Sequence, residues 1–298
     1  MDERLEVVAD DGVRLVGTLA RPPAPGRAPA ALLLNGSGPL DRDSNVKRQR
    51  LGVAPALAGA LAARGVASLR LDKRGVGESG GDYLPTGFDR ETGDAAVALA
   101  ALRAAPGIDP ARLTVVGHSA GAIIAIRLAR GDDDLAGIVL LAAAARPGTE
   151  VMREQSERIA ASLRGLARLA SGRMQRRQER ARCRLLASRE DVLRIDGKRL
   201  PARWLREYMA YDPAADLPDV RSPVLAITGA NDLQVDPGDV ARLGELVAGP
   251  FEGEVPDDLT HLLRRHPGPP SLSTYKAQLR EPVDAWLLDR VAAWTAAH

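Results

Sequence analysis

Short apolar runs alternate with helix-length segments along most of the chain, and this alternation limits the fold more than any other feature. Five runs have the length and composition of strands buried on both faces: "PAALLLNGSG", "VASLRLDKRG", "RLTVVGH", "LAGIVLLAA" and "SPVLAITGAND". Segments of helical composition follow the first three, at residues 51–64, 88–104 and 119–130. Because connections that can hold a helix join parallel strands, the pattern predicts a parallel sheet with helices on both faces.

The two ends of the chain extend this pattern. "VRLVGTLARP" alternates with a period of two after the turn signal at 10–12, which predicts two paired strands near the start. Beyond the last apolar run, the sequence predicts a helix at 240–247, a strand around "GPFEGEVPD" and a final helix at about 282–297.

Between residues 146 and 212 the alternation stops. This stretch is dense in Arg, Glu, Ala and Leu, and it predicts helices separated by Gly165 and Gly172. We interpret it as a helical cap inserted into one α/β core, whose two parts are residues 1–145 and 213–298. A chain of 298 residues is long enough for one such domain with an insertion.

Composition excludes several classes of protein. The formal net charge of +2 is too small to indicate a nucleic-acid partner, and a single cysteine, Cys183, allows neither an intramolecular disulfide nor a thiolate-rich metal site. The start of the chain lacks the basic and apolar segments of a secretory signal. Its longest nearly apolar run, residues 135–145, is shorter than the roughly 20 residues that cross a bilayer. We expect a cytoplasmic protein without stable membrane insertion; the oligomeric state is not predicted.

The stretch "VVGHSAG" places one hydroxyl where a strand-like run changes into a helix-like one. In the pattern G-x-S-x-G the serine lies on a sharp strand-to-helix turn, and glycines two residues away avoid collisions with nearby backbone. Gly117, Ser119 and Gly121 match this pattern. Ser119 is therefore a candidate nucleophile. The alternative is an ordinary strand-to-helix turn softened by glycine.

A serine hydroxyl needs a nearby base, and four histidines are available: His118, His261, His266 and His298. His118 adjoins the serine and should point away from it, and His298 ends the chain. We expect His261, in "PDDLTHLL", to be the base, because it follows the last predicted strand on the same side as the serine. His266, in a proline-rich loop, is the alternative candidate. His261 would otherwise cap a helix or lie on the surface.

A carboxylate should orient the base and offset its charge. "TGANDLQVDPGD" follows a buried strand and offers Asp232, Asp236 and Asp239. Asp232 comes first after the strand, so it is the predicted acid. Asp236 and Asp239 suit a solvated turn and a helix start, and the alternative for Asp232 is an ordinary turn residue.

Two backbone N–H groups should stabilise the oxyanion of an acyl-transfer reaction. One is the N–H of Ala120, directly after the candidate nucleophile. The second is the N–H of Ser37 in "LLLNGSGPLDRD", where glycines let the backbone approach a ligand. A phosphate-binding loop is excluded, because neither the glycine-rich phosphate-binding motif nor the glycine-rich dinucleotide-binding motif is complete there.

The motifs "NGSGPLDRD", "LRLDKRGVGESGG", "VVGHSAG", "TGANDLQV" and "DLTHLL" occur in the order and approximate spacing of bacterial α/β hydrolases. Outside residues 146–212 the chain resembles the carboxylesterase and serine-aminopeptidase-like group of that superfamily. The resemblance implies a mostly parallel eight-stranded sheet, with the helical cap inserted after the sixth strand. It also implies Ser119, Asp232 and His261 as the catalytic triad and Ser37 and Ala120 as oxyanion donors. Many relatives have histidine where this chain has Asn35.

These observations predict a serine hydrolase that cleaves small to medium carboxylic esters, or thioesters or lactones, through an acyl-enzyme. The expected partner is a small-molecule ester, and no metal or organic cofactor is expected. Trp204 and Tyr208, with Met209 and Tyr211, are candidates for the substrate pocket; packing of the cap on the core is the alternative. A peptidase, an amidase, an acyltransferase or a non-catalytic binding protein would also fit these residues.

Overall fold

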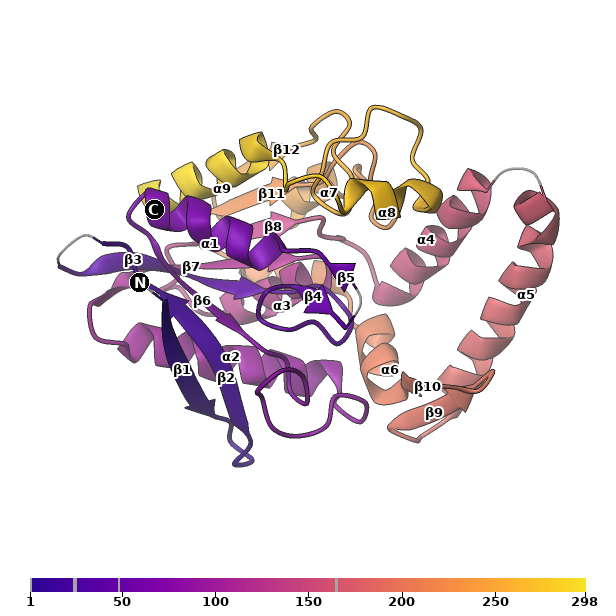
Figure 1. The fold of residues 1–298 in the computed structure, drawn as a ribbon, viewed down its shortest axis with the longest axis horizontal. Helices are drawn as coiled ribbons and strands as arrows, with labels where there is room; N and C mark the ends of the chain where they lie inside the picture. Colours follow the sequence, from indigo (N-terminus) through magenta and orange to yellow (C-terminus); the bar gives the residue numbers. More distant parts are fainter. Residues whose placement is uncertain (1, 24–25, 48, 164–165) are drawn as a thin grey trace.

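The computed structural model describes residues 2–23, 26–47, 49–163 and 166–298, and one large sheet runs through these residues (Figure 1). Its strands, in spatial order β1-β2-β6-β3-β7-β8-β11-β12, are β1 (Asp2–Val8), β2 (Arg14–Ala20), β6 (Ala67–Leu71), β3 (Ala28–Leu34), β7 (Ile108–His118), β8 (Gly137–Leu141), β11 (Val224–Ile227) and β12 (Phe251–Glu254). β1 pairs antiparallel with β2, and β2 with β6, whereas every other neighbouring pair in this sheet is parallel. The predicted mostly parallel eight-stranded sheet is confirmed.

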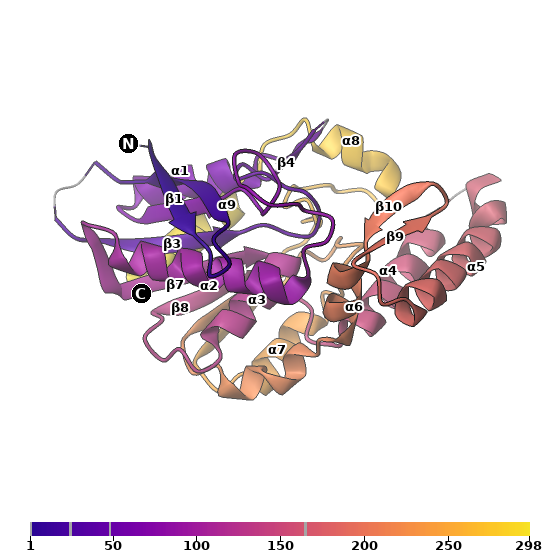
Figure 2. The ribbon, with the colours of Figure 1, turned by 90° about the horizontal axis from the view of Figure 1, so that it is seen from below.

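Helices cover both faces of the sheet (Figure 2). One face carries α1 (Val53–Ala63) and α9 (Ala285–Ala297), and the other carries α2 (Phe88–Ala104), α3 (Ala120–Ala129) and α7 (Asp239–Leu246). Successive residues of β3 pack against opposite helix layers. Leu32 packs on the side of α2 and α3, and Leu33 packs on the side of α1 and α9. Because successive side chains of a strand point to opposite faces, a strand buried on both sides must be apolar throughout.

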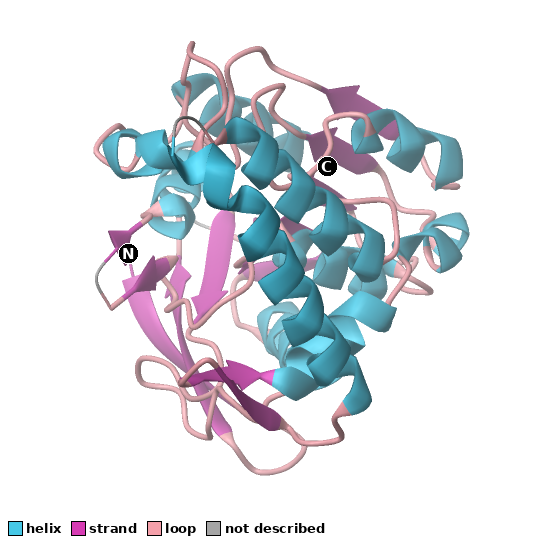
Figure 3. Ribbon diagram, turned by 90° about the vertical axis from the view of Figure 1, so that its right-hand side faces the viewer, coloured by secondary structure: helices cyan, strands magenta, loops and turns pink. Residues whose placement is uncertain are grey.

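The connection from β8 to β11 forms a separate cluster of elements, whose helices face the viewer in Figure 3. It comprises α4 (Gly148–Ser162), α5 (Leu166–Ala187), β9 (Val192–Ile195), β10 (Lys198–Pro201) and α6 (Ala202–Ala210). It leaves the sheet after the sixth strand in chain order, as predicted. We call this cluster the insertion.

Two details of the insertion differ from the prediction. It is not wholly helical, because β9 and β10 form an antiparallel hairpin. Asp196 and Gly197 lie at its turn with φ of 53° and 78°, the left-handed values that a tight hairpin turn requires. Gly172 does not separate two helices, because α5 continues through it; an interior glycine weakens a helix by roughly 1 kcal/mol without ending it. Gly165 lies outside the described residues.

Shorter elements complete the chain: the hairpin β4 (Asn45–Val46) and β5 (Gln49–Arg50), the helix α8 (Tyr275–Gln278), and 3₁₀ turns at 213–215, 217–219 and 272–274. Within the described ranges, no helix combines the length and the apolar character that crossing a membrane requires.

Candidate active site

The predicted triad residues and the loop with Ser37 each follow the carboxyl end of a strand. The loop with Ser37 follows β3, Ser119 follows β7, Asp232 follows β11, and His261 follows β12. All four strands run parallel, so these ends lie at one edge of the sheet, where ligands of open α/β sheets bind.

Ser119 occupies the sharp turn between β7 and α3. Its backbone has φ 55° and ψ −120°, a conformation that L-residues rarely adopt, and its N–H donates to the Leu141 carbonyl at 2.8 Å. A Cβ on Gly117 would lie 2.3 Å from the Gly121 carbonyl oxygen, and one on Gly121 would lie 2.4 Å from the Leu34 carbonyl oxygen. Larger residues would therefore push β7, α3 and β3 apart, which is the steric reason for both glycines.

Asp232 and His261 form a buried hydrogen-bonded pair. The Nδ1 atom of His261 lies 2.9 and 3.1 Å from the two carboxylate oxygens of Asp232. The backbone N–H groups of Gln234 and Val235 also donate to Oδ1, at 2.7 and 3.0 Å. Because a carboxylate oxygen accepts hydrogen bonds, this contact fits the tautomer of His261 that carries a proton on Nδ1, and Nε2 takes no part in it.

The two alternative aspartates make other contacts. Asp236 forms an ion pair with Arg158 of α4. Asp239 is buried at the start of α7 and accepts from Arg146 at 2.9 and 3.1 Å. Burial raises the pKa of Asp239, although the hydrogen bonds from Arg146 oppose this shift. Asp236 therefore connects α4 to the loop before α7. Asp239 connects Arg146, which precedes α4, to the first turn of α7.

Among the described residues, none of the other histidines forms a hydrogen bond to Asp232. The Nε2–H of His118 donates to the backbone carbonyl of His261 at 3.0 Å, and burial, with a smaller effect of the neighbouring His261 ring, lowers the pKa of His118 to about 3. His266 lies in a loop, and His298 stacks on Trp294 with ring centroids 4.1 Å apart. Within the described part of the chain, no hydrogen bond joins the Ser119 hydroxyl to His261, whose ring centroid lies 5.0 Å from that of His118.

Ser119 and Ala120 line a cavity of about 320 Å³ together with Ser37. Among the described residues, neither the N–H of Ser37 nor that of Ala120 donates to a protein acceptor, so both donors are available to a ligand. Other residues that line this cavity were not predicted from the sequence, including Tyr83, Met152, Gln155, Leu200, Leu205 and Gln234. No local signal identifies them, because most come from the insertion or from loops whose placement depends on tertiary packing.

Trp204 and Tyr208 of α6, the candidates for the substrate pocket, both line this cavity. Their rings stack with centroids 5.0 Å apart, and both meet the ring of Phe88 edge-on, at 5.5 and 5.4 Å. Burial raises the pKa of Tyr208 to about 12. Met209 packs inside the insertion, and the Tyr211 hydroxyl donates to an aspartate, so these two are not among the residues that line this cavity.

The side chain of Asn35 forms hydrogen bonds within the loop that carries Ser37. Its amide donates to the Asp41 carbonyl at 2.8 Å and accepts from the Ser44 hydroxyl at 2.6 Å. The side chain therefore closes the loop on itself. A Cβ on the next residue, Gly36, would lie 3.3 Å from the Cβ of Ser119, so the loop backbone packs directly against the turn at Ser119.

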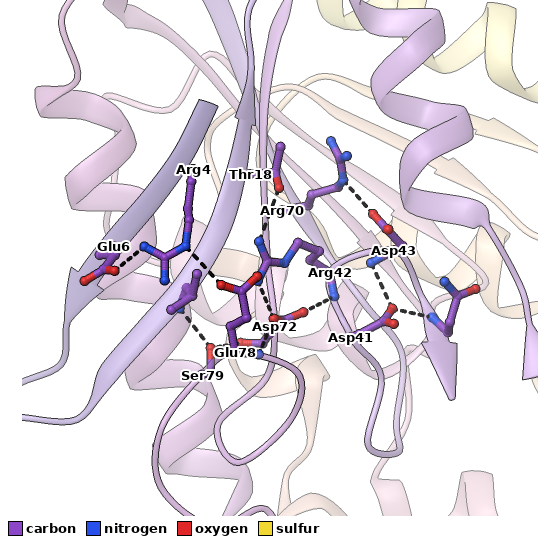
Figure 4. Close-up of polar contacts among 12 residues, drawn as sticks. Arg4, Glu6, Thr18, Asp41, Arg42, Asp43, Arg70, Asp72, Glu78 and Ser79 are labelled. Carbon is purple, nitrogen blue, oxygen red and sulfur yellow. Dashed lines mark hydrogen bonds and ion pairs between the residues drawn. The ribbon is translucent and has the colours of Figure 1, made fainter. Parts of the chain in front are cut away.

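A second set of contacts holds the same loop from the sheet side (Figure 4). Asp72 accepts from the backbone N–H of Arg42 at 2.7 Å, from the Arg42 guanidinium at 2.6 Å and from the Glu78 N–H at 2.8 Å. The Ser79 hydroxyl donates to the Asp72 carbonyl at 2.8 Å and accepts from the N–H of Val16 at 2.9 Å. Asp72 and Ser79 thus act as structural hydrogen-bonding residues between β2 and the loops.

Comparison with known proteins agrees with this architecture. Residues 49–263 match the family described as serine aminopeptidase, S33. The chain is 28% identical to Esterase EstD of Thermotoga maritima over 283 residues, which are 94% of this chain and 65% of the relative. It thus spans slightly less than two thirds of that protein.

Solved structures show the same fold at low sequence identity. The α/β hydrolase GrgF from Penicillium sp. sh18 superposes with a TM-score of 0.66 at 15% identity, covering 100% of this chain and 99% of GrgF. Est1E from Butyrivibrio proteoclasticus, with ferulic acid bound, has a TM-score of 0.65 at 15% identity, covering 99% and 100%. The Pyrococcus furiosus esterase Pf2001 has a TM-score of 0.57 at 18% identity, covering 88% and 82%.

Proposed function

The chain belongs to the serine aminopeptidase (S33) family of α/β hydrolases, and from this premise we propose that it hydrolyses carboxylic esters, with Ser119 as nucleophile. His261 is the general base and Asp232 is the carboxylate that orients it. The observation that carries the proposal is the buried Asp232–His261 hydrogen bond at the sheet edge where Ser119 occupies its strained turn. The esterase name of the Thermotoga maritima relative supports ester chemistry.

The reaction follows from these groups. Nε2 of His261 removes the proton of Ser119 as Oγ attacks the ester carbonyl, and the N–H groups of Ser37 and Ala120 bind the resulting oxyanion. The protonated imidazole then gives its proton to the alcohol as this group leaves. The acyl group stays bound to Ser119 as the acyl-enzyme. A water molecule, deprotonated by the same imidazole, attacks the acyl group. The imidazolium then returns this proton to Oγ of Ser119 as the acyl C–O bond breaks and the acid leaves.

Two assays separate this proposal from its alternatives. The wild type should hydrolyse p-nitrophenyl acetate and should be labelled by a fluorophosphonate probe, whereas Ser119→Ala should do neither. Equal labelling of both proteins would contradict the role of Ser119, and no labelling of either would favour a binding protein. An aminoacyl p-nitroanilide panel tests peptidase activity, and faster turnover of these amides than of esters would contradict the esterase proposal.

We further propose that the acyl group has a medium-length chain. Met152, Leu200 and Leu205 line both the Ser119 cavity and a larger cavity of about 580 Å³ inside the insertion. Leu185 and Met209 add apolar surface to the larger cavity. An acyl chain that passes these shared residues would leave water for an apolar surface, at roughly 0.8 kcal/mol per CH₂ group.

Leu205→Trp tests this path, because the larger side chain should narrow the connection between the two cavities. We expect kcat/KM for p-nitrophenyl octanoate to fall at least tenfold relative to the acetate ester. Leu186→Trp is the matched control, because Leu186 is 48% exposed on the same insertion. An unchanged preference in Leu205→Trp would contradict the path.

We also propose that residues 146–212 act as a cap over the core at 1–145 and 213–298, in a cytoplasmic protein. The contacts of α4 with the core include two polar pairs, Arg158 with Asp236 and Gln155 with Gln234 at 2.9 Å, whereas α6 packs Trp204 and Tyr208 on Phe88 of the core. Amide hydrogen exchange should then show α4 and α5 opening at lower free energy than the strands of the core. Uniform protection of both parts would contradict a separate cap.

A further inference from the structure

A charged side chain lies behind the loop that carries Ser37, and the proposed chemistry does not use it. Lys73 follows β6, and its Nζ atom donates to the Gly36 carbonyl at 2.5 Å. Nζ also forms an ion pair with Glu91 of α2 at 2.5 Å. The two side chains are only 9% and 13% exposed, so this pair is largely withdrawn from solvent. A lysine held in this way has few orientations open to it.

The planarity of the peptide bond gives this contact a consequence. The Gly36 carbonyl and the Ser37 N–H belong to one peptide unit, and in a trans peptide these two groups point in opposite directions. Lys73 therefore fixes the direction of the Ser37 N–H when it holds the Gly36 carbonyl. Ser37 lines the cavity of Ser119, whereas Lys73 is not among the residues that line it. Lys73 thus contacts the carbonyl of this peptide without lining the cavity that Ser37 lines.

The insertion reaches the same lysine through Glu91. The indole N–H of Trp204 donates to Oε2 of Glu91, while Oε1 of that carboxylate pairs with Lys73. Trp204 belongs to α6 and lines the Ser119 cavity. A continuous series of polar contacts therefore runs from a wall of the cavity, through Glu91 and Lys73, to the backbone of the loop.

We propose that Lys73 is a positioning residue that orients the Ser37 N–H toward the oxyanion, and that Glu91 and Trp204 couple this orientation to the insertion. This inference rests on the proposed esterase function. It assigns Lys73 a role in stabilising the transition state rather than in binding the ground-state ester. The alternative is an ion pair that only stabilises the fold.

Lys73→Met removes the donor and keeps most of the side-chain volume. The loss of one well-placed oxyanion donor lowers kcat by roughly 10²–10³-fold in comparable sites, so we expect kcat for p-nitrophenyl acetate to fall about 100-fold. KM should stay within about threefold, and the inhibition constant of a trifluoromethyl ketone, which mimics the tetrahedral anion, should rise by the same factor as kcat/KM falls. Lys73→Arg should recover part of kcat. Lys276→Met, at an exposed lysine of α8, is the matched control.

Trp204→Phe tests the coupling, because it removes the indole N–H and keeps an aromatic ring. We expect kcat to fall three- to tenfold in the wild-type background and to change less than twofold in the Lys73→Met background, as for residues that act through one contact. Equal effects in both backgrounds would overturn the coupling. If Lys73→Met does not fold, Glu91→Gln replaces it, and an unchanged kcat in Glu91→Gln would overturn the role of Lys73.

The two proposals fail in different ways. If the wild type neither turns over esters nor reacts with fluorophosphonate, the proposed function is wrong. If the wild type is active and Lys73→Met lowers only the melting temperature, with kcat and ketone inhibition unchanged, the positioning role is wrong and the esterase function stands.

Discussion

Replacing Asp232 with asparagine tests the proposed triad with almost no change in shape. Oδ1 of Asp232 accepts the N–H groups of Gln234 and Val235, while Oδ2 makes the shorter contact, 2.9 Å, with Nδ1 of His261. An asparagine must therefore keep its carbonyl oxygen at the Oδ1 position. Its NH₂ group then faces Nδ1 of His261.

The opposite orientation of the amide is unfavourable. It would place the NH₂ group against the N–H groups of Gln234 and Val235, and leaving the buried Val235 donor unpaired costs about 1–3 kcal/mol. Facing the NH₂ group, Nδ1 of His261 must accept, so its proton moves to Nε2. That tautomer cannot remove the proton of Ser119. In a comparable triad this change lowers kcat about 10⁴-fold, equivalent to about 5.4 kcal/mol of transition-state stabilisation.

The assay is the steady-state hydrolysis of p-nitrophenyl acetate at pH 7.5, with circular dichroism to establish folding. Asp236→Asn is the control, because Asp236 lies in the same loop and pairs with Arg158. We expect this control to retain activity within threefold of wild type. A kcat of Asp232→Asn within tenfold of wild type would refute the assignment of Asp232 as the orienting acid.

Three further predictions concern stability. Burial lowers the pKa of His118 to about 3 in the folded protein, against 6.5 in the unfolded chain, so between pH 6.5 and 5 only the unfolded state gains this proton. The free energy of unfolding should therefore fall by about 2 kcal/mol over that range, and denaturant titration of His118→Gln should show a smaller fall. Arg74→Met leaves the buried Asp94 without the guanidinium that contacts it at 2.6 and 2.9 Å, and it should lower the free energy of unfolding by about 3–5 kcal/mol. Arg14→Met, at an exposed arginine, should change this free energy by less than about 1 kcal/mol, and equal effects of the two variants would contradict a stabilising role of the Arg74–Asp94 pair. Phe88→Ala empties a fully buried site against Trp204 and Tyr208 and should cost about 3–5 kcal/mol in urea unfolding, and a cost below about 1 kcal/mol would show that α6 collapses into the space.

Local patterns were sufficient for the elements whose burial follows the sequence period. The helix at 88–104 has the predicted bounds, and the early strands pair around the turn at 10–12. The turn at Ser119 was also predictable, because the glycines that relieve its collisions lie two residues away. In each case the deciding interactions lie within a few residues along the chain.

The sequence contained a signal for the β9–β10 hairpin that was not used. Asp196 and Gly197 form a dipeptide typical of tight hairpin turns, and the residues before it alternate in "VLRI". The surrounding arginines and alanines favoured helix. The Lys73 contacts with Gly36 and Glu91 had no such signal, because the motif around Lys73 does not indicate which carbonyl or carboxylate it meets after folding.

The positive φ of Ser119 lowers the stability of the folded protein. A non-glycine residue in a rarely populated conformation loses of order 1–3 kcal/mol, which packing elsewhere has to offset. Ser119→Gly should therefore melt at a higher temperature than the wild type, although it lacks the hydroxyl. Selection for thermal stability alone would favour glycine at this position, and under the proposed function the serine is kept because it supplies the nucleophile.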